Sequence, residues 1–233
     1  AIFSSSVSQG TAEKFIVYRP LQILTYALDY HFWRLNPWGY HLTNLFWHLA
    51  AALGVFWLMT LLFNRLGLSL ATALLFVTHP VHTGAVSYIS GRADPLAFTL
   101  ILLTFIFYLK ASECHRPHVF AAMAIFYVAA LLSRETSLVL PFLILAMHFS
   151  LKRSSYPRAL AALFLLAGAY VILRVTVFKS FLRDEAYMIS LAERLPGVFV
   201  ALLGYARLLL WPFGLHMQYG QRLFLYTDPV FFL

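Results

Sequence analysis

The sequence predicts an all-α fold, a multi-pass transmembrane helix bundle, and three observations support this fold class. Hydrophobic residues make up 61% of the 233 residues, charged residues make up only 11%, and the mean hydropathy is +0.77. A soluble domain of this size needs more polar surface than such a composition supplies. Several apolar runs approach the ~20 residues that an α-helix needs to cross a bilayer. Short polar clusters separate these runs, as expected for loops at two membrane surfaces.

Charge and cysteine content narrow the class of protein further. The net charge is +8, but the basic residues are scattered between apolar runs and form no stripe. We therefore expect no nucleic-acid partner and interpret the charge as cytoplasmic anchors and pockets for an anionic ligand. Cys114 is the only cysteine, which excludes an internal disulfide and a cysteine metal cluster. The sequence starts at Ala1 and ends in an apolar run, so we expect an internal piece of a longer protein.

The first expected element is an interfacial amphipathic helix over residues 18–35, after a loop over residues 1–17. Pro20 suits a first helical turn. Many aromatic side chains in this stretch suit the headgroup level of a membrane. Asn36 and Pro37 end the helix. The leucines that recur at helical spacing are Leu21, Leu24 and Leu28.

Residues 38–233 are expected to contain about seven membrane helices. The first run is long enough, at about 1.5 Å per residue, to cross a core of roughly 30 Å. Later runs are shorter, which suits helices that end at a polar cavity. Residues 110–118 are expected to form a polar hairpin loop, and residues 179–194 a charged connection. The expected spans cover residues 40–63, 68–77, 95–109, 119–132, 138–149, 159–178 and 195–211.

His41, Asn44 and His48 are spaced to lie on one face of the first span. They either contribute to a site or are simply hydrogen-bonded inside the bundle.

Alternation of the spans gives the bundle an orientation. One side receives mainly basic residues and little acid, which matches a cytoplasmic face under the positive-inside rule. The opposite side receives residues 79–94 and the pair Arg134 and Glu135. The basic residues on the first side are Arg65, Lys110, Arg116, Lys152, Arg153 and Arg158.

Two arginine–acid motifs on the non-cytoplasmic side are candidate anion sites. Arg92 with Asp94, and Arg134 with Glu135, each stand just before an apolar run. Each arginine is then near a helix N-terminus, where backbone N–H groups favour an anion, and arginine binds phosphate in bidentate fashion. The alternative is a local salt bridge that holds a helix end. Asp94 or Glu135 is a candidate general base if its arginine neighbour leaves it free.

His79 and His82 are three residues apart in the same stretch. A metal site needs a third close ligand, so we interpret them as histidines that hydrogen-bond a polar ligand or orient a phosphate. Phosphate-binding and nucleophile motifs of soluble enzymes are absent from the sequence, which argues against soluble nucleotide chemistry.

Four motifs in register resemble one family. They are Tyr18-Arg19-Pro20-Leu21; Asn36-Pro37-Trp38-Gly39-Tyr40-His41-Leu42-Thr43-Asn44; His79-Pro80-Val81-His82-Thr83 with Gly91-Arg92-Ala93-Asp94; and Ser133-Arg134-Glu135-Thr136. Together they resemble the transmembrane and tetratricopeptide-repeat-containing O-mannosyltransferases and their bacterial relatives, in the GT-C glycosyltransferase superfamily. The segment 211–220 looks like the bacterial members. The resemblance implies one GT-C-like membrane domain, with residues 1–37 at the end of its first outer loop.

The resemblance also implies an activity and a set of roles. Such enzymes move a sugar from a polyprenyl phosphate to a protein or glycan hydroxyl on the lumenal or periplasmic face. Arg19, Arg92 and Arg134 would bind the donor phosphate, and His79 and His82 would orient it. The principal base would lie upstream of Ala1, the first span and the downstream repeat domain would be missing, and no metal or cofactor would be required. At Gly84 the relatives usually carry Glu.

The tight loops and the 211–220 match favour a bacterial inner membrane, with the endoplasmic reticulum as the location in a eukaryote. Two rival functions stay open at this point. One is a transporter or flippase of an anionic lipid or solute, and the other is a catalytically inactive membrane scaffold.

Overall fold

The computed structural model describes residues 18–151, 156–176, 191–213 and 215, and these residues form helices and connecting turns without a β-strand. The predicted all-α class is therefore confirmed for the part of the chain that is described. The predicted loop 1–17, Lys152, Arg153 and residues 179–190 lie outside it.

Proline and asparagine mark several helix ends. Proline is the first residue of five of the described helices, where its missing N–H has no intrahelical partner to lose. The Asn36 side chain accepts a hydrogen bond from the Trp38 N–H at 3.1 Å and so caps the second helix. The helices are α1 (Pro20–Trp33), α2 (Pro37–Phe63), α3 (Leu66–Thr78), η1 (Pro80–His82), α4 (Thr83–Ser87), η2 (Ile89–Arg92), α5 (Ala93–Cys114), α6 (Pro117–Ser133), η3 (Glu135–Val139), α7 (Leu140–Leu151), α8 (Pro157–Thr176) and α9 (Leu191–Leu210).

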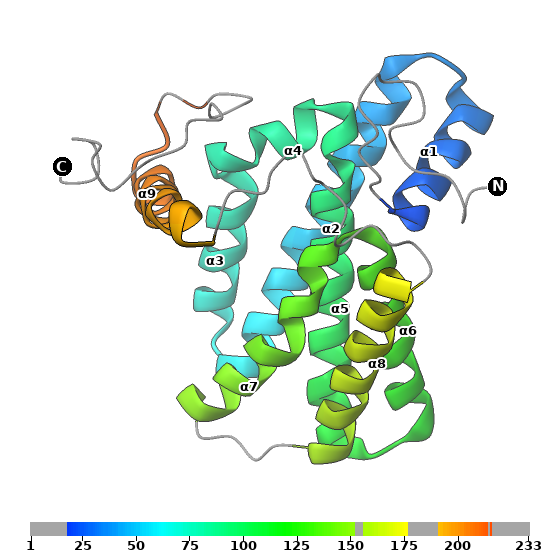
Figure 1. The fold of residues 1–233 in the computed structure, drawn as a ribbon, viewed down its shortest axis with the longest axis vertical. Coiled ribbons are helices and arrows are strands. Elements are labelled where there is room, and N and C mark those ends of the chain that lie inside the picture. Colours follow the sequence, from blue (N-terminus) through cyan, green and yellow to red (C-terminus); the bar gives the residue numbers. More distant parts are fainter. Residues whose placement is uncertain (1–17, 152–155, 177–190, 214, 216–233) are drawn as a thin grey trace.

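Helix α5 is the centre of the bundle. It packs against α2 and α6 over most of its length and touches α7 and α8 (Figure 1). Its Ile106 and Tyr108 have no exposed surface, and they belong to one core with side chains from the neighbouring helices. Other fully buried members of that core are Met123, Tyr127, Ile144 and Leu163.

Among the residues that the structure describes, three stretches are long and apolar enough to cross a membrane: α2, α8 and the segment Ile89–Cys114. A fourth is added if α3 and Pro80–Ser87, which meet at a bend of 48°, are one broken span. Three further apolar helices, Pro117–Ser133, Glu135–Leu151 and Gly197–Leu210, are shorter. The number of about seven membrane helices therefore stays a prediction.

The predicted hairpin loop over residues 110–118 is wrong in its extent. Helix α5 continues to Cys114, and only His115 and Arg116 separate it from α6. Polar residues alone do not end a helix, and Lys110 keeps its ammonium 4.3 Å from the centre of the Trp57 ring on α2. The turn comes where His115 takes a left-handed conformation, with φ 51°, just before Pro117.

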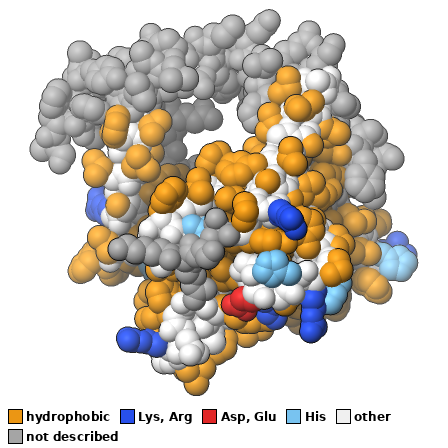
Figure 2. Space-filling model, turned by 90° about the horizontal axis from the view of Figure 1, so that it is seen from below, with side chains coloured by type: hydrophobic (Ala, Val, Ile, Leu, Met, Phe, Trp, Pro, Cys, Tyr) orange, Lys and Arg blue, Asp and Glu red, His pale blue; other side chains and the backbone are white. Residues whose placement is uncertain are grey.

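The two ends of the bundle differ in charge. The end that carries α1 and α4, at the top of Figure 1, receives residues 79–94, Arg134 and Glu135, and we call it the polar end. The opposite end carries Arg65, Arg116 and Arg158, and Figure 2, which looks at it from below, shows more basic than acidic side chains. This is the distribution that the alternation of spans predicts.

Candidate functional site

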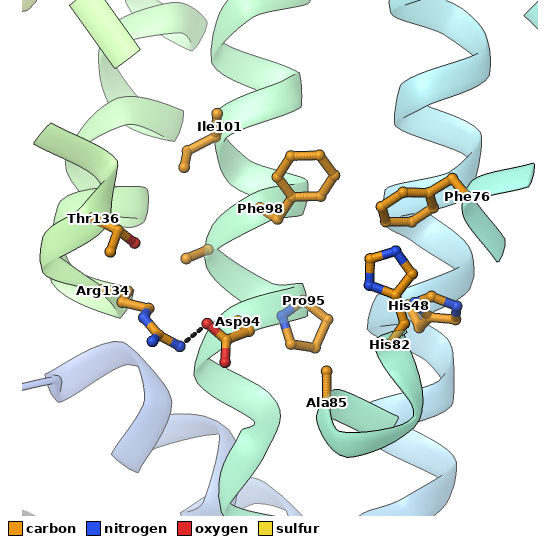
Figure 3. A pocket seen from close by; sticks show the side chains of 11 residues that line it. His48, Phe76, His82, Ala85, Asp94, Pro95, Phe98, Ile101, Arg134 and Thr136 are labelled. Carbon is orange, nitrogen blue, oxygen red and sulfur yellow. Dashed lines mark ion pairs between the residues drawn. The ribbon is translucent and has the colours of Figure 1, made fainter. Parts of the chain in front are cut away.

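A cavity of about 300 Å³ lies between α2, α3 and α5, close to the polar end. This volume is at the lower limit of the roughly 300–1,000 Å³ of small-molecule sites. The polar residues that line it are His48, His82, Asp94, Arg134 and Thr136, and the larger apolar ones are Phe76, Pro95, Phe98 and Ile101 (Figure 3).

Arg134 and Asp94 form an ion pair on one side of this cavity (Figure 3). Asp94 lies in the first turn of α5, and Arg134 is the residue between α6 and η3. The Asp94 side chain keeps 52% of its surface exposed, and the Arg134 side chain keeps 29%. A ligand in the cavity can therefore reach both charges.

The other side of the cavity is formed by two imidazoles, His48 from α2 and His82 from η1 (Figure 3). Their ring centres are 5.4 Å apart, and Phe76 packs against both, 5.5 Å from His48 and 4.4 Å from His82. Burial, and then the neighbouring imidazoles of His48 and His79, hold the pKa of His82 below its usual value. His82 is therefore neutral at pH 7.

Arg92 does not line the cavity. It has no exposed surface, and its guanidinium forms an ion pair with Asp29 of α1. Its Nε donates to Asn44 Oδ1 at 2.7 Å, and its Nη2 donates to the Tyr40 carbonyl at 3.1 Å. The Tyr26 ring lies 4.5 Å from the guanidinium carbon. A phosphate could reach Arg92 only if these contacts opened. The ion pair that Arg92 makes joins it to Asp29 of α1 and is not the local pair with Asp94 that the motif suggested.

Glu135 is held by two arginines from different helices. Arg19, at the start of α1, donates to Oε2 at 3.1 Å, and Arg174 of α8 donates to Oε1 at 2.8 Å. Burial alone would raise the pKa of the Glu135 carboxyl, but the hydrogen bond from Arg174 and the charges of Arg19 and Arg174 outweigh it and lower that pKa. Such a carboxylate is a poor proton acceptor. The arrangement therefore suits a structural ion pair that connects α1 to α8 better than it suits a general base.

His79 also has its ring nitrogens engaged. Nδ1 accepts a hydrogen bond from the Val81 N–H at 3.2 Å, so the proton of the neutral ring is on Nε2, which donates to the Leu209 carbonyl of α9 at 3.1 Å. His79 therefore links η1 to α9. Gly84, by contrast, has open space where a Cβ would stand, so a larger side chain fits there.

The structure thus brings together His82, Asp94 and Arg134 of the predicted site residues. Arg19 and Glu135 lie next to this group, while Arg92 and His79 make other contacts. The sequence interpretation left His48 open between a site and a bundle hydrogen bond, and it did not single out Phe76, Phe98 or Arg174. An arginine inside an apolar run, as Arg174 is, was a usable signal.

Within the described residues, no three histidine, cysteine or acidic side chains are grouped so that they could hold a metal ion. The expectation that no metal or cofactor is required stays a prediction.

Comparison with known proteins confirms the predicted resemblance. The chain is 38% identical over 112 residues to human protein O-mannosyl-transferase TMTC1, covering 48% of this chain and 12% of the relative. It is 45% identical over 94 residues to protein O-mannosyl-transferase tmtc2 of Xenopus laevis, covering 40% and 11%. It is 36% identical over 122 residues to protein O-mannosyl-transferase Tmtc1 of Drosophila melanogaster, covering 52% and 14%. The matches therefore span only about an eighth of the length of these relatives.

No family model matches the chain. No solved structure matches it either.

Proposed function

We propose, from its similarity to protein O-mannosyl-transferases, that the chain is part of the membrane domain of a glycosyltransferase. The enzyme moves mannose, or a closely related sugar, from a polyprenyl-phosphate donor to a hydroxyl of a protein or glycan. The membrane bundle, the cavity at its polar end and the names of the relatives support this proposal.

The observation that carries the proposal is the Arg134 guanidinium at a cavity whose remaining wall is largely apolar. A polyprenyl phosphate has one anionic group on a long hydrocarbon chain. Arg134 offers the bidentate donor that suits the phosphate, and Phe98 and Ile101 of α5 offer apolar contact next to it. As the sugar leaves, charge develops on the phosphate, and a fixed guanidinium stabilises it. The phosphate is already a good leaving group, so this chemistry needs no metal.

The other charged residues take supporting roles in this proposal. Arg19 is close enough to Arg134 to act on it electrostatically, so it adds to the positive potential at the phosphate. Arg92 and Glu135 hold α1 against the bundle. The principal base is expected upstream of Ala1, and Asp94 is the most exposed carboxylate at the cavity itself.

In this proposal, the polar end faces the lumen or the periplasm, and the partners are membrane lipid, the polyprenyl-phosphate sugar and a protein or glycan acceptor. The relatives compared above are animal proteins. The bacterial inner membrane therefore stays a prediction, with the endoplasmic reticulum as its alternative.

The test is transfer from polyprenyl-phosphate mannose by the purified full-length protein, with an acceptor peptide. Arg134→Ala is expected to lower kcat/KM by about 10²–10³, as removal of one charge-stabilising donor does. Arg158→Ala is the matched control, because Arg158 is an exposed arginine at the opposite end of the bundle. Equal turnover of wild type and Arg134→Ala would refute the phosphate assignment. Binding and translocation of the lipid without release of the sugar would favour the transporter instead.

A further inference from the structure

We propose that His48 and His82, with Phe76 beside them, form a subsite for the sugar ring of the donor. This inference rests on the proposed function and adds to it by separating the phosphate side of the cavity from a side that recognises neutral hydroxyl groups.

The first step is the hydrogen-bonding state of His48. This residue is 5% exposed, and its Nε2 lies 3.1 Å from the Val77 carbonyl near the end of α3. A carbonyl oxygen only accepts hydrogen bonds, so Nε2 carries the proton. In the neutral ring Nδ1 is then an acceptor, and no described residue donates to it. Nδ1 can take a hydrogen bond from a ligand.

His82 has two ring nitrogens available for hydrogen bonds to a ligand. It is half-buried at the cavity, and no hydrogen bond joins either ring nitrogen to the part of the chain that the structure describes. As a neutral imidazole it offers one donor and one acceptor. Polar groups that lose water without gaining a partner are costly, so a half-buried ring of this kind suits a site that a polar ligand completes.

The acceptor nitrogens of the two imidazoles indicate which polar part of the polyprenyl-phosphate sugar binds there, the phosphate or the sugar. Phosphate oxygens at neutral pH accept hydrogen bonds and carry negative charge, so they gain little from an acceptor such as His48 Nδ1. A sugar hydroxyl both donates and accepts, and it can satisfy His48 and His82 together. The histidine side of the cavity therefore suits a polyhydroxy ring better than a phosphate.

The aromatic surface fits the same ligand. Phe76 lies against both imidazoles, and Phe98 stacks on Phe76 with ring centres 5.4 Å apart and planes 26° apart. The C–H face of a sugar ring packs well on aromatic carbon through dispersion and the negative face of the ring. With about 300 Å³ in all, the cavity has room for one sugar ring rather than an oligosaccharide.

The positions match the order of groups in the donor. Figure 3 places the Arg134–Asp94 pair on one side of the cavity and the two imidazoles on the other, with Pro95 and Phe98 between them. A phosphate at Arg134 would then direct the attached sugar toward His48 and His82.

The experiment compares two ligands on the purified full-length protein: polyprenyl-phosphate mannose and bare polyprenyl phosphate. His48→Gln keeps an amide N–H for the Val77 carbonyl and replaces the fixed Nδ1 acceptor of the ring by an amide oxygen at a different position. His82→Phe keeps an aromatic ring beside Phe76 and removes both nitrogens. His118→Gln, at an exposed position near the opposite end, is the control, and thermal unfolding checks that every variant is folded.

We expect His48→Gln and His82→Phe each to weaken binding of the mannosylated lipid about tenfold, the effect of about 1.4 kcal/mol, and to leave bare polyprenyl phosphate unchanged. Arg134→Ala should weaken both ligands. Equal losses for both ligands, or no loss for either, in the histidine variants would overturn the sugar subsite and leave the proposed function standing. If wild type binds neither lipid, the proposed function fails, and the subsite fails with it.

Discussion

Arg92 and Asp29 form an ion pair that joins the start of α5 to α1, with 0% of the arginine side chain and 8% of the aspartate side chain exposed. The same guanidinium donates to Asn44 of α2, so one side chain connects three helices. Gln22 and Tyr26 of α1 reinforce the connection by donating to the carbonyls of Ser90 and Ile89. The segment that leads into Asp94 is therefore fixed from one side by α1, which makes this helix part of the support of the cavity.

Arg92→Ala is expected to destabilise the protein strongly, because it leaves Asp29 buried without its counter-charge. Removal of one partner of a buried pair costs about 3–5 kcal/mol. Arg92→Lys should recover only part of this, since an ammonium cannot reach Asp29, Asn44 and the Tyr40 carbonyl in the same planar arrangement. Thermal unfolding in detergent measures both, with Arg158→Ala as the exposed control. A wild-type melting temperature for Arg92→Lys would mean that the fork geometry is not needed.

The contacts of Glu135 predict a dependence of stability on pH. Its pKa is lowered in the folded protein from an ordinary value of 4.5, so the carboxylate contributes stability above that value and loses it as the pH falls through the folded pKa. Wild type should therefore be more stable than Glu135→Gln at neutral pH, and the difference should shrink below about pH 4.5. Melting temperatures of both proteins between pH 3 and 7 measure it. A difference that does not change with pH would show that the charge of Glu135 is not what holds Arg19 and Arg174.

Helices and their ends were largely predictable, because proline, asparagine and apolar periodicity are local signals. Pro20 begins a helix where the sequence suggests a start, whereas Pro37 and Pro117 begin α2 and α6 slightly before the predicted spans 40–63 and 119–132. The end of α5 was not predictable, because the polar residues after Lys110 continue the helix. The ion pairs between residues far apart in the sequence were harder to predict.

Sequence neighbours suggest Arg92 with Asp94 and Arg134 with Glu135, yet the observed ion pairs join these residues to other partners. Arg92 pairs with Asp29, Arg134 with Asp94, and Glu135 with both Arg19 and Arg174. A local motif can show that charges collect at one end of the bundle. Which charges meet there depends on how α1, α5 and α8 pack, and that information is not local.

Gly39 predicts a packing effect at the junction of α1 and α2. A Cβ there would stand 2.1 Å from Cγ of the Trp33 ring, so Gly39→Ala must displace that ring. Overpacking of this kind costs about 1–3 kcal/mol. Gly168→Ala in α8 is the matched control, since its Cβ meets open space and alanine is the better helix former. Thermal unfolding should rank Gly168→Ala at or above wild type and Gly39→Ala below it, and the reverse order would contradict the tight approach of Trp33.

Asp94→Asn separates competition for Arg134 from catalysis. In the structure Asp94 occupies the guanidinium that we assign to the phosphate, so loss of its charge should leave Arg134 freer for an anion. Because both side chains are partly exposed, the pair is worth about 0.2–1 kcal/mol, and polyprenyl phosphate should bind up to about fivefold more tightly to Asp94→Asn.

The same variant tests the role of Asp94 in transfer. Because we propose that the principal base lies upstream of Ala1, kcat of the full-length protein should change little, whereas loss of a general base would lower it by about 10²–10⁴. The control is the double variant with Arg134→Ala. It should bind polyprenyl phosphate no better than Arg134→Ala alone, because it lacks the guanidinium for which Asp94 and the phosphate compete. Weaker phosphate binding by Asp94→Asn would instead show that the carboxylate holds Arg134 in the orientation that the phosphate needs.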